Sequence, residues 1–264
     1  MMTVDIFKTL SLPEQTAAAL QKISLPALIP ALEDIQKFPD RLKEFAGLNN
    51  GLTILRLFLE WIPSLQAQYQ SLGIPESIFR DNLTDITLWT EDYWEKHGTP
   101  GFAEWEWVAN TFLLRVFRLG RLQFEPSVLE KDALQYPAGT TVLEVHIPAG
   151  EPLDVSSVEE SMKKAPVFFE NHFRRQFALF RCHSWLLSPQ LKKLLPEQSR
   201  ILRFQNLFTV YGEDSERQAE ERVFGYLSDD PALYPEGTSL QRSLKQALLD
   251  GQPVGMGMGI RKIP

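Results

Sequence analysis

The sequence has little cysteine, no long apolar run and no excess of positive charge, and each absence excludes a class of protein. Its single cysteine, Cys182, cannot form an intramolecular disulfide, and the four histidines show no metal-ligand spacing, so no metal is expected. No segment approaches the roughly 18 uninterrupted apolar residues of a membrane span. With 27 Lys and Arg against 34 Asp and Glu, the net charge of −7 is unfavourable for a nucleic-acid binder.

The N-terminal segment, Met1–Leu12, lacks a basic stretch followed by an apolar core, so no secretory signal is expected and a cytoplasmic location is predicted. The 264 residues are 44% hydrophobic and 23% charged, which is ordinary for a globular chain that folds on its own core.

The first hundred residues have the pattern of amphipathic helices. Between Leu52 and Leu65, apolar residues recur at steps of three and four, and Gly73 is suited to end that helix. Further helices are predicted over 13–23, 75–96 and 103–116.

After Arg118 the pattern changes to short apolar or alternating runs. Strands are predicted at Leu119–Glu125, Thr141–Pro148, Phe177–Leu187, Arg200–Tyr211 and Val254–Ile263. Residues Val155–Phe173 have a helical period. A helix there would join the second and third strands, which predicts that these two strands are parallel. The expected fold class is therefore α+β, with a helical N-terminal domain over residues 1–117 and a mixed-sheet domain over residues 118–264.

One face of the predicted strands carries long polar side chains. Residues two apart on a strand share a face, which groups Glu144 with His146, Arg181 with His183, and Arg203 with Gln205. This face holds histidine and arginine but no lysine, which favours a site over simple solvation. A solvated sheet face, with His146 paired to Glu144 and Arg181 or Arg203 paired to Glu125, is the alternative.

The loop at residues 149–154 links a strand to a helix N-terminus, where free backbone N–H groups suit a phosphate. An ordinary turn is the alternative, because Glu151 and Asp154 place negative charge there. The acidic stretch Glu213–Glu221 is interpreted as a solvated helix face.

Two further motifs are discounted. Residues 255–259 spell GxGxG, but only five residues follow, so they cannot open a helix. A terminal strand that allows close approach of another backbone or a ligand is predicted instead. Cys182 and His183 are adjacent on a strand and point to opposite faces, so Cys182 is predicted to be core rather than a nucleophile.

Three segments carry a family resemblance: FRLGRLQFE at 117–125, VHIPAG at 145–150 and CHSWLL at 182–187. In this order they resemble a bacterial acyltransferase family with a helical N-acyltransferase N-terminal domain and a GNAT-like C-terminal domain. The resemblance implies that strand 141–148 separates from its neighbour to admit the pantetheine arm of acyl-CoA. It also implies that Ala149 and Gly150 face the diphosphate, although only Gly150 remains of the usual glycine pattern.

The resulting hypothesis is acyl transfer from acyl-CoA to an amine of a small molecule. Direct attack needs a base, for which Glu144 and His146 are the candidates, and a proton source for the thiolate, for which Ser184 is a candidate. Four side chains are candidates for binding the acceptor: Arg181, His183, Arg203 and Gln205. The alternatives are a non-catalytic GNAT-like module that binds a metabolite or partner protein, and a helical scaffold.

Overall fold

The computed structural model describes residues 10–26 and 29–264, so most of the segment examined for a secretory signal lies outside it. Its contacts divide the chain into a helical unit, Met1–Leu119 with Pro148–Gly150, and a sheet unit, Gly120–Ile147 with Glu151–Pro264. Of the helices in the described residues, none has the length and apolarity needed to cross a membrane.

The helical unit confirms the predicted helices. Its helices are α2 Glu14–Leu20, α3 Leu32–Lys37, α4 Leu52–Ser71, α5 Glu76–His97 and α6 Trp105–Phe112, with 3-10 turns η1 Pro39–Glu44 and η2 Leu48–Gly51. The core of this unit is aromatic where α4 meets α6, since the rings of Phe58 and Phe112 stack with their centroids 4.7 Å apart. The apolar stripe of α4 is thus buried, as its three- and four-residue spacing predicts.

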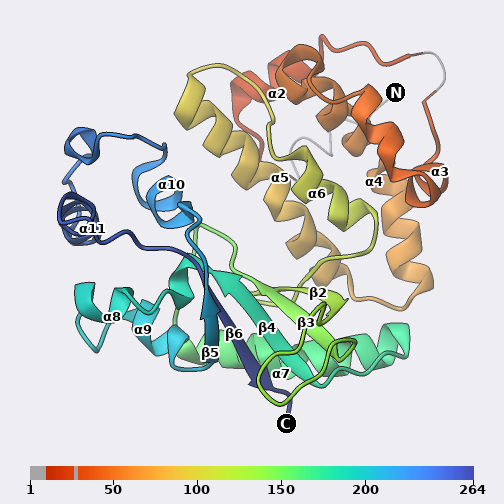
Figure 1. The fold of residues 1–264 in the computed structure, drawn as a ribbon. Helices are drawn as coiled ribbons and strands as arrows, with labels where there is room; N and C mark the ends of the chain where they lie inside the picture. The colour runs from red at the N-terminus through yellow and green to blue at the C-terminus, as the bar shows by residue number, and fades with distance from the viewer. Residues whose placement is uncertain (1–9, 27–28) are drawn as a thin grey trace. The chain divides into compact units, whose positions relative to one another are not determined.

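A six-stranded mixed sheet has the order β1-β2-β3-β4-β6-β5 (Figure 1). Its strands are β1 Phe117–Arg118, β2 Gln123–Val128, β3 Thr141–His146, β4 Leu179–Ser184, β5 Thr209–Glu213 and β6 Gly257–Lys262. Strands β3 and β4 are parallel and joined by α7 Val155–Phe173, while the β2–β3, β4–β6 and β6–β5 pairs are antiparallel. The predicted parallel pair and its crossover helix are therefore confirmed.

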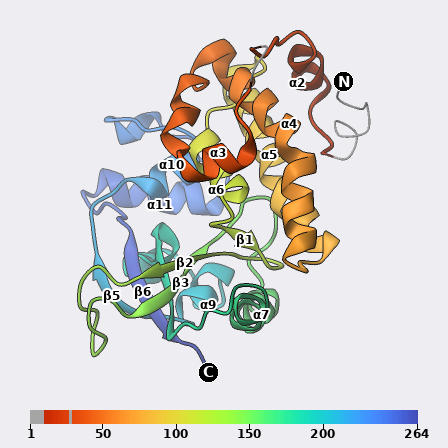
Figure 2. The ribbon, with the colours of Figure 1, turned by 90° about the vertical axis from the view of Figure 1, so that its right-hand side faces the viewer.

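Helix α7 covers one face of this sheet (Figures 1 and 2). Arg261, on β6, reaches the helix from that face and contacts Glu159 and Met162. Cys182 is completely buried on the same face, and burial raises the pKa of its thiol. Its prediction as a core residue is confirmed.

The opposite face is apolar at the end where β3 and β4 begin. There Val142, Leu179 and Ile260 pack beneath Leu129 and Ala133, from the segment between β2 and β3. Further along the strands the same face becomes polar.

The predicted strand Arg200–Tyr211 is wrong. Its first half forms α9, Arg200–Gln205, and only its end belongs to β5. Ser199 caps this helix, because its Oγ accepts a hydrogen bond from the Leu202 N–H at 3.1 Å. Arg203 and Gln205 consequently lie on a helix and not on the sheet.

The terminal strand confirms the predicted close approach of another backbone. A Cβ atom on Gly257 would lie 2.2 Å from the carbonyl oxygen of Leu187, in the 3-10 turn η3 Trp185–Leu187. One on Gly255 would lie 1.9 Å from the carbonyl oxygen of Asp214. Only glycine allows β6 to pass these two segments so closely.

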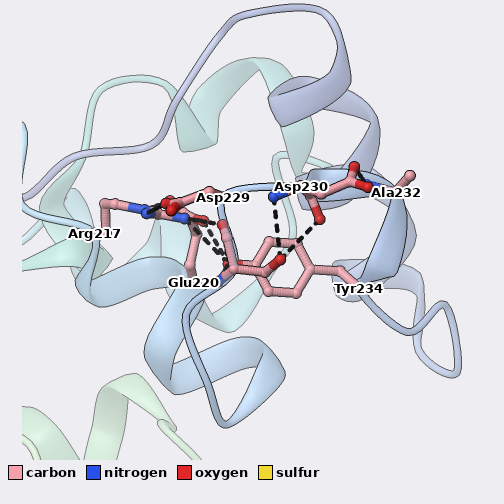
Figure 3. A network of polar contacts seen from close by, with 7 residues as sticks. Arg217, Glu220, Asp229, Asp230, Ala232 and Tyr234 are labelled. Atoms are coloured by element: carbon pink, nitrogen blue, oxygen red, sulfur yellow. Dashed lines mark hydrogen bonds and ion pairs between the residues drawn. The ribbon is translucent and has the colours of Figure 1, made fainter.

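The remaining helices of the sheet unit enclose a second small core. They are α8 Leu191–Leu194, α10 Gln218–Phe224, η4 Pro231–Leu233 and α11 Ser239–Leu249. Tyr234 stacks on Phe224 at 3.9 Å, and its hydroxyl donates to Glu220 Oε2 at 2.7 Å. Arg217 binds the same carboxylate, which completes a polar network that ties α10 to η4 (Figure 3).

Candidate active site

The polar face, which we define by Glu125, Glu144, His146, Arg181 and His183, lies opposite α7. Glu125 on β2, Glu144 on β3 and Arg181 on β4 stand in register across the three strands. Arg181 Nε lies 2.6 Å from Glu144 Oε1, a close ion pair without hydrogen-bond alignment, and the side chains are only 25% and 12% exposed. Burial raises the pKa of Glu144, although the charges of Arg181 and His146 oppose this shift.

Each histidine of the polar face pairs with a carboxylate. His146 Nε2 lies 3.2 Å from Glu125 Oε2, and His183 Nε2 lies 2.6 Å from Asp214 Oδ2. The alternative of a solvated sheet face predicts that His146 pairs with Glu144 and that Arg181 pairs with Glu125. The observed partners are exchanged. Strand parity identifies which residues share a face, but it does not identify their partners.

Asp214 is the functional candidate that the sequence analysis missed, because it was assigned to a solvated helix face. It follows β5 directly, and its Oδ1 accepts the Glu216 N–H at 2.9 Å. Burial disfavours its ionised form, but the bonds from the Glu216 N–H and His183 outweigh burial and hold the pKa of Asp214 below its usual value. At neutral pH it is therefore a carboxylate fixed against an imidazole.

Strands β3 and β4 stop pairing midway along their length. Their register contains Val142 with Leu179, Leu143 with Phe180, and Glu144 with Arg181. Beyond that point β3 continues to pair with β2 as far as His146, and β4 continues to pair with β6 as far as Ser184. The two strands thus separate after Glu144 and Arg181, as the resemblance implies, with one histidine on each side.

Three other candidates lie away from the polar face. Ser184 is buried on the opposite face, and its Oγ accepts the Leu186 N–H at 3.2 Å to cap η3. Gln205 is buried and donates to the Ser188 carbonyl at 2.8 Å, whereas Arg203 is exposed on α9. The structure does not bring these side chains together with the two histidines.

The loop between β3 and α7 contains Ala149 and Gly150, and Gly150 adopts the left-handed conformation with φ 91°. The buried guanidinium of Arg121 donates to the carbonyls of Glu151 at 2.9 Å and Pro152 at 3.0 Å. At the other end of the loop, the Asp154 carboxylate pairs with Arg200 Nε at 2.9 Å. Two arginines thus hold this loop.

Within residues 10–26 and 29–264, no group of three or more His, Cys, Asp or Glu could hold a metal.

Comparison with known families identifies both parts of the chain. The sequence matches the N-acyltransferase N-terminal domain over residues 3–114 and the GNAT-like C-terminal domain over residues 116–261. The chain belongs to the GNAT-like C-terminal domain family. Its two matches, in this order, identify a GNAT-type N-acyltransferase with the two-domain organisation that the resemblance implies. No protein of curated function matches the sequence.

Solved acyltransferases share the fold of this GNAT-type chain. One, in complex with decanoyl-CoA and teicoplanin, has a TM-score of 0.81 and 24% identity, covering 98% of this chain and 87% of that chain. A mutant acyltransferase in complex with octanoyl-CoA has a TM-score of 0.73 and 23% identity, covering 100% of both chains.

Proposed function

We propose that the protein transfers an acyl group from acyl-CoA to an amine of a small molecule, with His183 as the base. The observation that carries this proposal is the separation of β3 from β4 beyond Glu144 and Arg181, with His146 and His183 on either side. Past that point the facing backbone groups of the two strands no longer pair with each other. They are available to the amides of a pantetheine arm and to the thioester carbonyl.

The reaction joins the amine nitrogen to the thioester carbon and breaks the carbon–sulfur bond. The proton from the amine goes to an imidazole, and the sulfur leaves as the thiolate of CoA. His183 is the better base because Asp214 lies 2.6 Å from its Nε2, which leaves Nδ1 to accept the proton. The resulting imidazolium can then protonate the thiolate, so no role is required of the buried Ser184.

The other polar side chains have supporting roles. Glu144 is bound to Arg181 and is poorly placed to act as a base, whereas His146, held by Glu125, lines the other side of the opening. The loop at Ala149 and Gly150 binds the diphosphate, supported by the left-handed conformation of Gly150, which turns the backbone there.

Medium-chain acyl-CoA is the proposed donor and a cytoplasmic amine the proposed acceptor. The solved acyltransferases of this fold hold decanoyl-CoA or octanoyl-CoA, and one of them also holds teicoplanin. The test measures thiol release from acetyl-, octanoyl- and decanoyl-CoA against a panel of amines that includes teicoplanin. Turnover with at least one pair is expected.

The variant His183→Ala should reduce kcat by about 100-fold or more, the usual contribution of a positioned base. Donor binding should persist, because the base acts on the acceptor amine and does not hold the donor. A thermal shift measures that binding: a ligand at about 100 times its Kd adds roughly 2.7 kcal/mol to stability and raises Tm by several degrees. The matched control is His97→Ala, which removes an exposed histidine at the end of α5 and should leave kcat unchanged. If no acyl-CoA is turned over and none raises Tm, the proposed function is wrong and a non-catalytic alternative is favoured.

A further inference from the structure

The side-chain pairs of the polar face follow the separation of the two strands. At the last paired position, Glu144 and Arg181 join β3 to β4. Two residues further along, His146 pairs outward with Glu125 on β2, and His183 pairs outward with Asp214 after β5. The side-chain pairs therefore change direction where the backbone pairing ends.

The Glu144–Arg181 pair is well suited to fix that position. Both side chains are largely buried, and ion pairs in a less polar environment are stronger and less screened than those on the surface. The outer pairings, β2 with β3 and β4 with β6, continue past this point without interruption. Of the strand pairs bordering the opening, only β3–β4 ends here.

We propose that the Glu144–Arg181 ion pair is a positioning device that sets how far an acyl thioester enters between β3 and β4. The pair thereby aligns the thioester carbonyl with His183. This role rests on the proposed function. A residue advances a strand by about 3.3 Å, so separation one residue earlier or later would displace the carbonyl by that distance. A displacement of about 1 Å is enough to cost roughly 100-fold in rate.

The test compares Glu144→Gln, Arg181→Met and the exchange variant Glu144→Arg/Arg181→Glu, with octanoyl-CoA as donor. Each single variant should lower kcat by about tenfold or more, while KM for octanoyl-CoA changes by less than about threefold. The shape of the pH–rate profile should not change, because the base is still His183. The exchange variant should recover at least about threefold over either single variant, since it restores a pair at the same position.

A matched control separates positioning from general destabilisation. Glu220→Gln also removes a buried carboxylate, which pairs with Nη2 of the more exposed Arg217 at 2.7 Å, in the same unit (Figure 3). It should lower Tm and leave kcat unchanged below the melting transition.

Each alternative outcome has a distinct meaning. Wild-type kcat in both single variants would overturn the positioning role alone, and so would an equal loss of kcat in Glu220→Gln. Loss of a limb of the pH profile in Glu144→Gln would make Glu144 the base. A wild type that turns over no acyl-CoA would refute the proposed function and this role with it.

Discussion

Arg121 links three segments of the sheet unit through hydrogen bonds. Its guanidinium donates to the carbonyls of Glu151 and Pro152, and its backbone N–H donates to Ser161 Oγ at 2.8 Å, on α7. With these carbonyls held by Arg121, the diphosphate proposed for this loop meets a fixed backbone. The variant Arg121→Met keeps the apolar stem and removes these two side-chain bonds.

The size of the effect follows from these two bonds. A hydrogen bond involving a charged group contributes about 1.5 kcal/mol net, so the loop loses about 3 kcal/mol of restraint. If half of that restraint is needed when the diphosphate binds, affinity for acyl-CoA falls about tenfold. The stability of the protein also falls, so the assay must be run well below the lowered Tm.

The assay compares octanoyl-CoA with S-octanoyl pantetheine, which has the same thioester arm but no diphosphate. In Arg121→Met, KM should rise about tenfold for octanoyl-CoA and less than about twofold for S-octanoyl pantetheine. The control is Arg203→Met, which removes an exposed arginine on α9. An equal rise for both donors would mean that Arg121 has only a general structural role. No rise for either would refute the assignment of the diphosphate to this loop.

Three further perturbations have defined outcomes. Gly257→Ala places a Cβ 2.2 Å from the Leu187 carbonyl oxygen, where about 3.3 Å is needed, so differential scanning fluorimetry should show Tm lower by roughly 4–8 °C. Burial opposes ionisation of Glu220, but Arg217 and Tyr234 outweigh it and hold its pKa below 4.5. Its stabilisation is complete above pH 4.5 and lost as pH falls through the lowered pKa, so the Tm gap between wild type and Glu220→Gln should narrow in acid. Asp154→Asn frees Arg200 from an exposed pair, so KM for acyl-CoA should fall about twofold in low salt and be unchanged in about 0.5 M NaCl.

The sequence predicts the elements whose patterns are long. The period over Val155–Phe173 has the bounds of α7, and the parallel arrangement of β3 and β4 follows from this crossover. The segment Arg200–Tyr211 was assigned wrongly because a short apolar run does not distinguish a buried strand from a short helix. Ser199, which caps α9, is the signal that distinguishes them.

The site was predictable only in part, for a physical reason. Parity places Glu144 with His146 and Arg181 with His183, because side chains alternate along a strand. The partner of each side chain depends on register and on loops, which local patterns do not encode. Asp214 is 31 residues from His183 along the chain, and the turn after β5 brings the two side chains together.

The acidic residues of the loop after β3 argue less strongly against a phosphate group once the neighbouring side chains are known. In the sequence, Glu151 and Asp154 argue against a phosphate group at this position. In the structure, Arg200 pairs with the Asp154 carboxylate, and Arg121 places a positive charge against the backbone carbonyl of Glu151. The usual glycine pattern shapes such a loop from within, through backbone freedom. Here a single glycine, Gly150, is accompanied by two arginines from other segments: Arg121 binds the loop backbone, and Arg200 pairs with one of its carboxylates.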